Sequence, residues 1–162
     1  MTPLIEIYPY KALCMLLQQE VPNCKTIGIF LTANAQGREE WRFLDDVLIL
    51  DVQDILDPKN PNTFQRAHAR EVLRFLQKNK DSGRICVCCD SGQSRSAATA
   101  AAIIRHFGGD DIHIWKNPRY KPNTLVYQRL LDAFGIEAPP EDIHFLRELN
   151  EKAFHNAIKS NY

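Results

Sequence analysis

The chain lacks an excess of either charge and lacks any long apolar run, and these absences exclude several classes of protein. Its 162 residues carry 20 basic and 20 acidic side chains, so the formal net charge at pH 7 is zero. Proteins that bind nucleic acid or anionic membranes usually carry a basic excess. No apolar stretch reaches the length that spans a bilayer, and residues 1–6 do not resemble a signal peptide. We therefore expect a cytoplasmic protein with neither nucleic acid nor a membrane as its partner.

Cysteines are few, and their spacing argues against both a disulfide framework and a metal site. There are five, an odd number, and three of them cluster at positions 86, 88 and 89. Reduced thiols in a cytoplasmic compartment fit this pattern better than disulfides do. Zinc sites usually take two separated ligand pairs, and adjacent strand residues point to opposite faces, so we predict no metal and no cofactor. Reversible oxidation that joins a reactive cysteine to another thiol stays open.

Internal repeats, low-complexity tracts and interdomain linkers are also missing, so we expect one domain over residues 1–162. Strand-like and helix-like patterns alternate along the chain, which is typical of an α/β fold. We predict a three-layer α/β/α domain with a mainly parallel central sheet. The predicted strands are residues 4–8, 26–31, 46–52 and 84–89, with a short extended piece at 112–115. The third strand is apolar enough to lie in the interior of a parallel sheet.

The helices are predicted from apolar residues at helical spacing and from capping residues. They cover residues 10–20, residues 63–78 with Thr63 as the cap, the Ala-rich stretch after residue 96 until Gly108, residues 123–134, and the chain from about Pro140. The first helix is predicted to bury Ala12, Leu13, Leu16 and Leu17, and the last to bury Ile143, Leu146, Leu149, Ala153 and Ile158. Residues 32–38 are predicted to form a loop, and Trp41, Phe43 and Leu44 to anchor a segment over the sheet.

Residues 84–96 combine a buried strand, a small glycine-containing loop and the start of a helix. This order aims backbone N–H groups and a helix N-terminus at one point, which makes an anion site. Cys89 lies at the end of the strand, where the helix dipole and the guanidinium of Arg95 should lower the pKa of its thiol. Arg95 can present two donors to a tetrahedral oxyanion. A nucleophile beneath a phosphate-sized cradle is suited to phosphoryl transfer.

The pattern Cys89-x5-Arg95-Ser96, with Gly92 in the middle and Ser94 before the arginine, resembles the loop of the cysteine-dependent protein tyrosine phosphatases. It is most similar to the dual-specificity branch and to small bacterial proteins predicted to be tyrosine phosphatases. The resemblance implies a phosphatase-like fold in which Cys89 attacks phosphorus and forms a phosphocysteine. It also implies that Ser96 hydrogen-bonds the sulfur and eases its departure. The phosphate-binding residues that it implies are Asp90, Ser91, Gly92, Gln93, Ser94 and Arg95.

A general acid is expected on the loop of residues 54–62, because the leaving oxygen needs a proton and α/β ligand sites lie at the carboxyl ends of strands. Asp54 and Asp57 are the two candidates. Val52-Gln53-Asp54 is similar to the strand-ending pattern of the relatives, whereas the interval from Asp57 to the nucleophile is nearer to theirs. We favour Asp54 as acid and base. Either aspartate is also a common turn former.

A third segment, residues 119–128, resembles the Pro-Asn helix start that follows the phosphate loop in these phosphatases. The resemblance implies that Asn123 supports the loop, although an N-cap alone explains the residue equally well. Lys116, Arg119 and Lys121 are candidates to rim the site and attract a phosphorylated partner.

Two residues depart from the pattern of the family. Cys88 stands where most relatives have histidine, and Asp90 adds a negative charge inside the anion loop, which should disfavour a thiolate and a dianionic substrate. We therefore expect metal-independent hydrolysis of phosphate monoesters, on a phosphorylated protein or a small molecule. Two alternatives remain: a catalytically impaired phosphate- or phosphoprotein-binding module, and an arsenate reductase or sulfurtransferase.

Overall fold

The computed structural model describes residues 2–19, 21–33 and 41–161. Four parallel strands form one sheet in the order β1-β4-β2-β3. The strands are β1 (Leu4–Pro9), β2 (Thr26–Leu31), β3 (Asp46–Leu50) and β4 (Arg84–Cys89). The helices are α1 (Tyr10–Gln19), α2 (Arg66–Lys78), α3 (Arg95–His106), α4 (Ile112–Trp115), α5 (Thr124–Phe134) and α6 (Pro140–Lys159).

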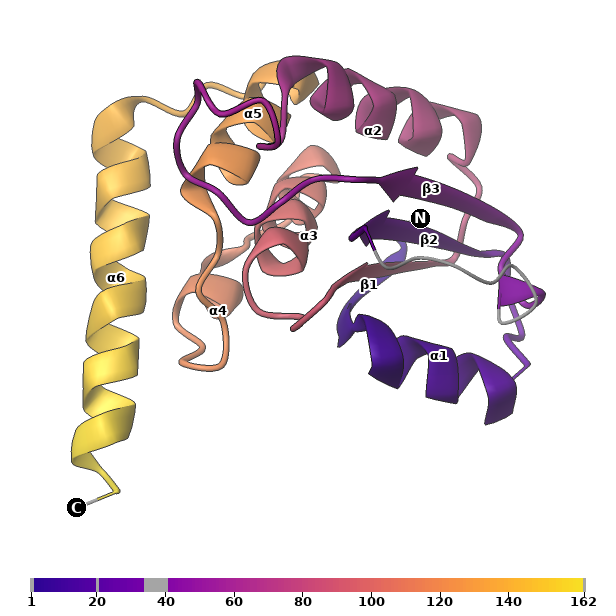
Figure 1. Cartoon of the computed structure of the whole chain (residues 1–162), viewed down its shortest axis with the longest axis horizontal. Coiled ribbons are helices and arrows are strands. Elements are labelled where there is room, and N and C mark those ends of the chain that lie inside the picture. The colour runs from indigo at the N-terminus through magenta and orange to yellow at the C-terminus, as the bar shows by residue number, and fades with distance from the viewer. Residues whose placement is uncertain (1, 20, 34–40, 162) are drawn as a thin grey trace.

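Helices cover both faces of the sheet, which makes the predicted three layers (Figure 1). Helix α1 lies on one face, and α2, α3 and α5 lie on the other. Helix α6 runs along the side of the molecule next to α4, beyond the helices that cover the sheet (Figure 1). The α/β class and the parallel sheet predicted from the sequence are confirmed.

Strand β4 divides its side chains between the two faces because successive strand residues point in opposite directions. Ile85, Val87 and Cys89 belong to the larger core, beneath α2, α3 and α5. Cys86 and Cys88 belong to the smaller core, with α1. Trp41 joins this smaller core by packing edge-on against Phe30, and Phe43 and Leu44 pack beside it, as predicted. The alternation places Cys89 on the opposite face from its two neighbouring thiols.

Several predicted features differ in the structure. Strand β3 lies at an edge of the sheet, not in its interior, because β2 is its one partner among the described strands, and Ile49 is exposed. Residues 112–115 form a helical turn instead of an extended piece, started by Asp110 accepting a bond from the amide of Ile112. Helix α2 begins at Arg66, since Thr63 donates its hydroxyl to the carbonyl of Ile55 and does not cap the helix.

The buried faces of the first and last helices also differ in part. Helix α1 buries Cys14 with Leu13 and Leu17, whereas Ala12 is exposed. In α6, Leu146 is buried but Ile158 is exposed, because the end of this helix runs past the elements that cover its beginning (Figure 1). Residues 34–38 of the predicted loop and Glu20 of the first predicted helix lie outside the described residues.

Candidate active site

The parallel strands β1, β4 and β2 have their carboxyl ends side by side, and Cys89 lies there. Cys89 is the last residue of β4, paired with Pro9 of β1 and Leu31 of β2. Residues 90–94 then turn, and α3 begins at Arg95. The positive end of the α3 dipole therefore lies beside the thiol, as the sequence predicts. The segment before α5 and the loop after β3 pack around the same turn, described below as the phosphate loop (residues 89–96).

Gly92 fits the phosphate loop for two physical reasons. Its φ is +67°, which is in the left-handed region that residues with a side chain rarely adopt. A Cβ at this position would also lie 2.5 Å from the backbone nitrogen of Pro9 and 2.8 Å from the carbonyl carbon of Tyr8. The loop therefore passes directly against the end of β1, and any side chain at position 92 would push it away.

The segment that leads into α5 fixes the orientation of two peptide groups in the phosphate loop. The amide of Lys121 donates to the carbonyl of Gln93 at 2.9 Å, and the amide of Asn123 donates to the carbonyl of Ser94 at 3.2 Å. In a trans peptide the C=O and the following N–H point in opposite directions. Because both carbonyls point outward, the amides of Ser94 and Arg95 point into the loop. This is the arrangement of donors that an anion needs.

The thiol of Cys89 is only 1% exposed, and its pKa reflects two opposed influences. Burial is the largest single influence and acts to raise the pKa. The hydroxyl of Ser96, 3.1 Å from the sulfur, the amides of Ser96 and Ser94, and the charge of Arg95 together outweigh it. The net result is a pKa below the ordinary cysteine value. A lowered pKa favours the thiolate, which is the nucleophilic form.

The guanidinium of Arg95 lies beneath the loop and is nearly buried. Its Nη1 donates to the carbonyl of Val52 at 2.7 Å, and its Nη2 donates to Asp90 at 3.0 Å. Its Nε is buried and has no hydrogen-bond partner among the described residues. Buried donors are almost always paired in proteins, so an unpaired one at a possible anion site suggests a ligand. Arg95 thus joins the phosphate loop to the chain that follows β3.

Asp90 is the residue of the loop that is least expected beside an anion. One carboxylate oxygen accepts from Arg95, and the other accepts from the hydroxyl of Thr32 just after β2. The carboxylate therefore links the phosphate loop to a neighbouring strand end. It also occupies one donor of Arg95 that would otherwise be available to an anion.

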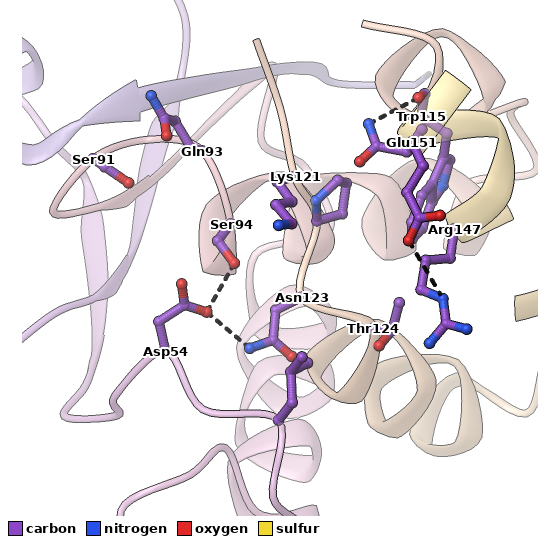
Figure 2. Close-up of a pocket in the computed structure, with 13 residues that line it drawn as sticks. Asp54, Ser91, Gln93, Ser94, Trp115, Lys121, Asn123, Thr124, Arg147 and Glu151 are labelled. Atoms are coloured by element: carbon purple, nitrogen blue, oxygen red, sulfur yellow. Dashed lines mark hydrogen bonds and ion pairs between the residues drawn. The ribbon is translucent and has the colours of Figure 1, made fainter. Parts of the chain in front are cut away.

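The two candidate acids differ in their contacts. Asp54 lies against the phosphate loop, and its Oδ1 accepts from Ser94 and from the side chain of Asn123, both at 2.8 Å (Figure 2). Asp57 instead accepts from the amide of Lys59 in a local turn. Asn123 is buried and serves as the N-cap of α5 while its amide group holds Asp54 and the carbonyl of Ile55. The contact with the phosphate loop therefore favours Asp54 over Asp57 as the candidate acid.

A cleft of about 340 Å³ opens beside the phosphate loop. Figure 2 shows Asp54 and Ser94 at one end and Arg147 and Glu151 of α6 at the other, with Lys121 between them. The other residues that line the cleft are Leu56, Ser91, Gln93, Trp115, Pro122, Asn123, Thr124 and Asn150.

Of the three predicted rim cations, only Lys121 lines this cleft. Arg119 lines a neighbouring one of about 440 Å³, and Lys116 is exposed at the end of α4. Sequence patterns did not reveal three contacts near the site, because each joins distant segments of the chain. Thr32 bonds to Asp90, the carbonyl of Val52 accepts from Arg95, and Asn150 bonds to the carbonyl of Trp115. The one available signal in the sequence was an asparagine, Asn150, on the predicted apolar face of the last amphipathic helix, where a polar side chain needs a hydrogen-bond partner.

Among the described residues, no group of three or more His, Cys, Asp or Glu side chains is arranged to hold a metal ion. Across the same residues, no helix is both long and apolar enough to cross a membrane. The cytoplasmic location stays a prediction.

Comparison with known proteins gives a likeness of structure only. No protein-family model and no curated protein matches the chain. The solved structures that match include Tk-PTP in its active form, with 13% identity and a TM-score of 0.46 over 91% of this chain and 90% of that chain. The Yvh1 phosphatase domain from Chaetomium thermophilum has 19% identity and a TM-score of 0.46 over 91% of this chain and 88% of that chain.

A further match is the catalytic domain of the PP-IP phosphatase SIW14 from S. cerevisiae, with 13% identity and a TM-score of 0.45 over 97% of this chain and 88% of that chain. With identities this low and TM-scores below 0.5, the function rests on the geometry of the site itself.

Proposed function

We propose that the protein hydrolyses phosphate monoesters through a phosphocysteine intermediate, without a metal ion. One observation carries the proposal: the Cys89 thiol has a lowered pKa beside a loop in which the amides of Ser94 and Arg95 point inward and the buried Nε of Arg95 has no partner among the described residues. A thiolate in an electropositive cradle is a nucleophile placed where a phosphate binds. The phosphate-binding groups are the amides of residues 90–95 and the guanidinium of Arg95.

In the first step the Cys89 thiolate attacks phosphorus, so that an S–P bond forms while the bond from phosphorus to the ester oxygen breaks. The leaving oxygen takes the electron pair of that bond and a proton from the carboxyl group of Asp54. The bonds of Asp54 to Ser94 and Asn123, on the side of the loop that faces the cleft, support this role.

In the second step water attacks the phosphocysteine and gives a proton to the Asp54 carboxylate. The S–P bond breaks, and the sulfur leaves as a thiolate, stabilised by the hydroxyl of Ser96 at 3.1 Å. Inorganic phosphate is released, and Asp54 is again protonated for the next cycle. The atoms and charges balance without a cofactor.

The substrate class that we propose is phosphotyrosine or a dual-specificity range, on a phosphorylated protein or as a small phosphate monoester. The cleft beside the loop continues from Ser94 to α6, which supports a substrate that is larger than phosphate alone. Leu56, exposed at its mouth, and Pro122 provide apolar surface for an aromatic ring.

A second candidate function is phosphate or phosphoprotein binding without turnover, and the position of Asp90 favours it. Its carboxylate lies 3.0 Å from the guanidinium of Arg95 and so opposes a phosphate dianion. The arsenate reductase alternative needs a second thiol at the site. Cys86 and Cys88 instead lie on the opposite face of the sheet, which argues against it.

The test is hydrolysis of p-nitrophenyl phosphate by the reduced protein, with and without EDTA, alongside Cys89→Ser. We expect turnover that survives chelation and is lost in Cys89→Ser, while vanadate still binds the wild type. Turnover that EDTA abolishes would contradict a metal-independent reaction. Vanadate binding without any turnover would support the binding module instead.

A further inference from the structure

Helix α6 carries one buried polar side chain toward the phosphate loop. Asn150 is 7% exposed, and its Nδ2 donates to the carbonyls of Trp115 at 3.0 Å and Tyr120 at 2.9 Å. These carbonyls stand at the beginning and end of the connection between α4 and the segment that contacts the loop. One amide group thus ties both ends of this connection to α6.

A series of hydrogen bonds leads from Asn150 to the loop that holds the nucleophile. The Tyr120–Lys121 peptide accepts from Asn150 through its carbonyl and donates through its N–H to the carbonyl of Gln93. In the Gln93–Ser94 peptide the carbonyl points outward, so the amide of Ser94 points into the loop, where it is among the groups that lower the pKa of Cys89. Two trans peptide groups therefore lie between the side chain of Asn150 and the surroundings of the thiol.

All dipoles in this series point the same way, with the positive end toward Cys89. Hydrogen bonds in a chain polarise one another, by roughly 10–30% per bond, so a donor at the far end strengthens the last one. The series also fixes the orientation of the Gln93–Ser94 peptide. If that peptide flipped by about 180°, its carbonyl would replace the amide beside the sulfur and would disfavour a negative charge there.

We propose that Asn150 is a positioning residue for the nucleophile: it holds the Tyr120–Lys121 peptide so that the amide of Ser94 stays directed at the sulfur of Cys89. This inference rests on the proposed function, since it concerns the same thiol. It gives α6, which lies at the side of the molecule, a part in the chemistry at the end of β4 (Figure 1).

The test compares three variants of α6 in the full chain. Asn150→Leu removes both donors while nearly keeping the volume of the side chain. Asn156→Leu makes the same change at an exposed position of the same helix. Leu146→Ala weakens the packing of α6 on the core without touching the series of hydrogen bonds. Thiolate formation at Cys89 is followed by ultraviolet absorbance against pH, with the matching Cys89→Ser protein subtracted in each case.

We expect Asn150→Leu to raise the pH midpoint of the Cys89 thiolate, equivalent to a two- to fivefold lower ionisation constant, on the order of one weakened hydrogen bond. Asn156→Leu and Leu146→Ala are expected to leave the midpoint in place. An unchanged midpoint in Asn150→Leu, or an equal shift in Leu146→Ala, overturns the positioning role. If Asn150→Leu does not fold, Asn150→Ser, which keeps a single shorter donor, is judged by the same criterion.

Turnover of p-nitrophenyl phosphate is measured on the same proteins and decides a separate question. Loss of kcat/KM at low pH in Asn150→Leu, recovered at higher pH, agrees with a shifted thiolate. If the wild type does not turn over, the proposed hydrolysis fails, while the thiolate titration still decides the role of Asn150.

Discussion

Cys88 and Cys89 are neighbours in one strand, yet their surroundings move their pKa values in opposite directions. Cys88 lies in the smaller core with Cys86, and burial raises the pKa of its thiol far above the ordinary range. Cys89 is equally buried, but the hydroxyl of Ser96, the loop amides and Arg95 outweigh burial and lower its pKa. Burial alone therefore leaves a thiol inert, and donors directed at the sulfur make it reactive.

The comparison also answers the concern raised by Cys88 in place of histidine. The side chain of residue 88 points to the opposite face of the sheet from the phosphate loop. The acidity of Cys89 is accounted for by groups that follow it in the loop, at positions 94, 95 and 96.

The largest expected effect comes from exchanging each cysteine of this pair for alanine. Cys89→Ala should lower kcat for aryl phosphate hydrolysis by at least about 10³-fold, because the nucleophile is removed. Cys88→Ala should leave kcat within about twofold and lower stability by about 1 kcal/mol, because it removes only packing. Steady-state kinetics and thermal unfolding of both variants test this. Equal losses of activity would mean that the two faces are not chemically distinct.

A second prediction extends the comparison to the two aspartates, which also share a residue type but not their contacts. Asp54→Asn should reduce kcat about 10²-fold with an alkyl phosphate, whose leaving group needs a proton. The loss should be smaller with p-nitrophenyl phosphate, which leaves readily as an anion. Asp57→Asn, the matched control, should behave as the wild type because Asp57 only stabilises a local turn. The reverse order would assign the acid to Asp57.

The smallest expected effect concerns the donor nearest to the sulfur. Ser96→Ala removes a hydroxyl that stabilises the thiolate, so the pKa of Cys89 rises toward its ordinary value. Since the thiolate forms above this pKa, the acid limb of kcat/KM should move to higher pH. At a pH below the new midpoint, activity should fall about tenfold or less. Ser96→Thr keeps the hydroxyl and should keep the limb in place; a limb that is unmoved in Ser96→Ala would remove Ser96 from the account of the thiol.

Local patterns were enough to predict most elements and the loop itself. The apolar run of residues 84–89 and the Ala-rich stretch after it predicted the strand and helix that enclose the site, because these patterns depend on near neighbours. The position of Gly92 followed in the same way, and its positive φ agrees with a tight loop.

What the sequence did not predict depends on contacts between distant segments. The edge position of β3 follows from strand order, which the composition of residues 46–52 does not encode. Gln65, not Thr63, precedes α2 because the hydroxyl of Thr63 bonds to Ile55. The sequence favoured Asp54 over Asp57, but it did not predict the contact of Asp54 with Asn123, 69 positions along the chain.

The close contact of Gly92 with the end of β1 has a consequence for how the site arises during synthesis. The phosphate loop rests against the first strand, and Asn150 of the last helix ties down the segment that orients its peptides. Contacts this far apart in sequence form late, because a long stretch of chain must be closed to make them. We therefore expect a nascent chain that has not yet released α6 from the ribosome to carry Cys89 in an incompletely ordered loop. We expect the thiol to become reactive only once α6 has packed, after the sheet has formed.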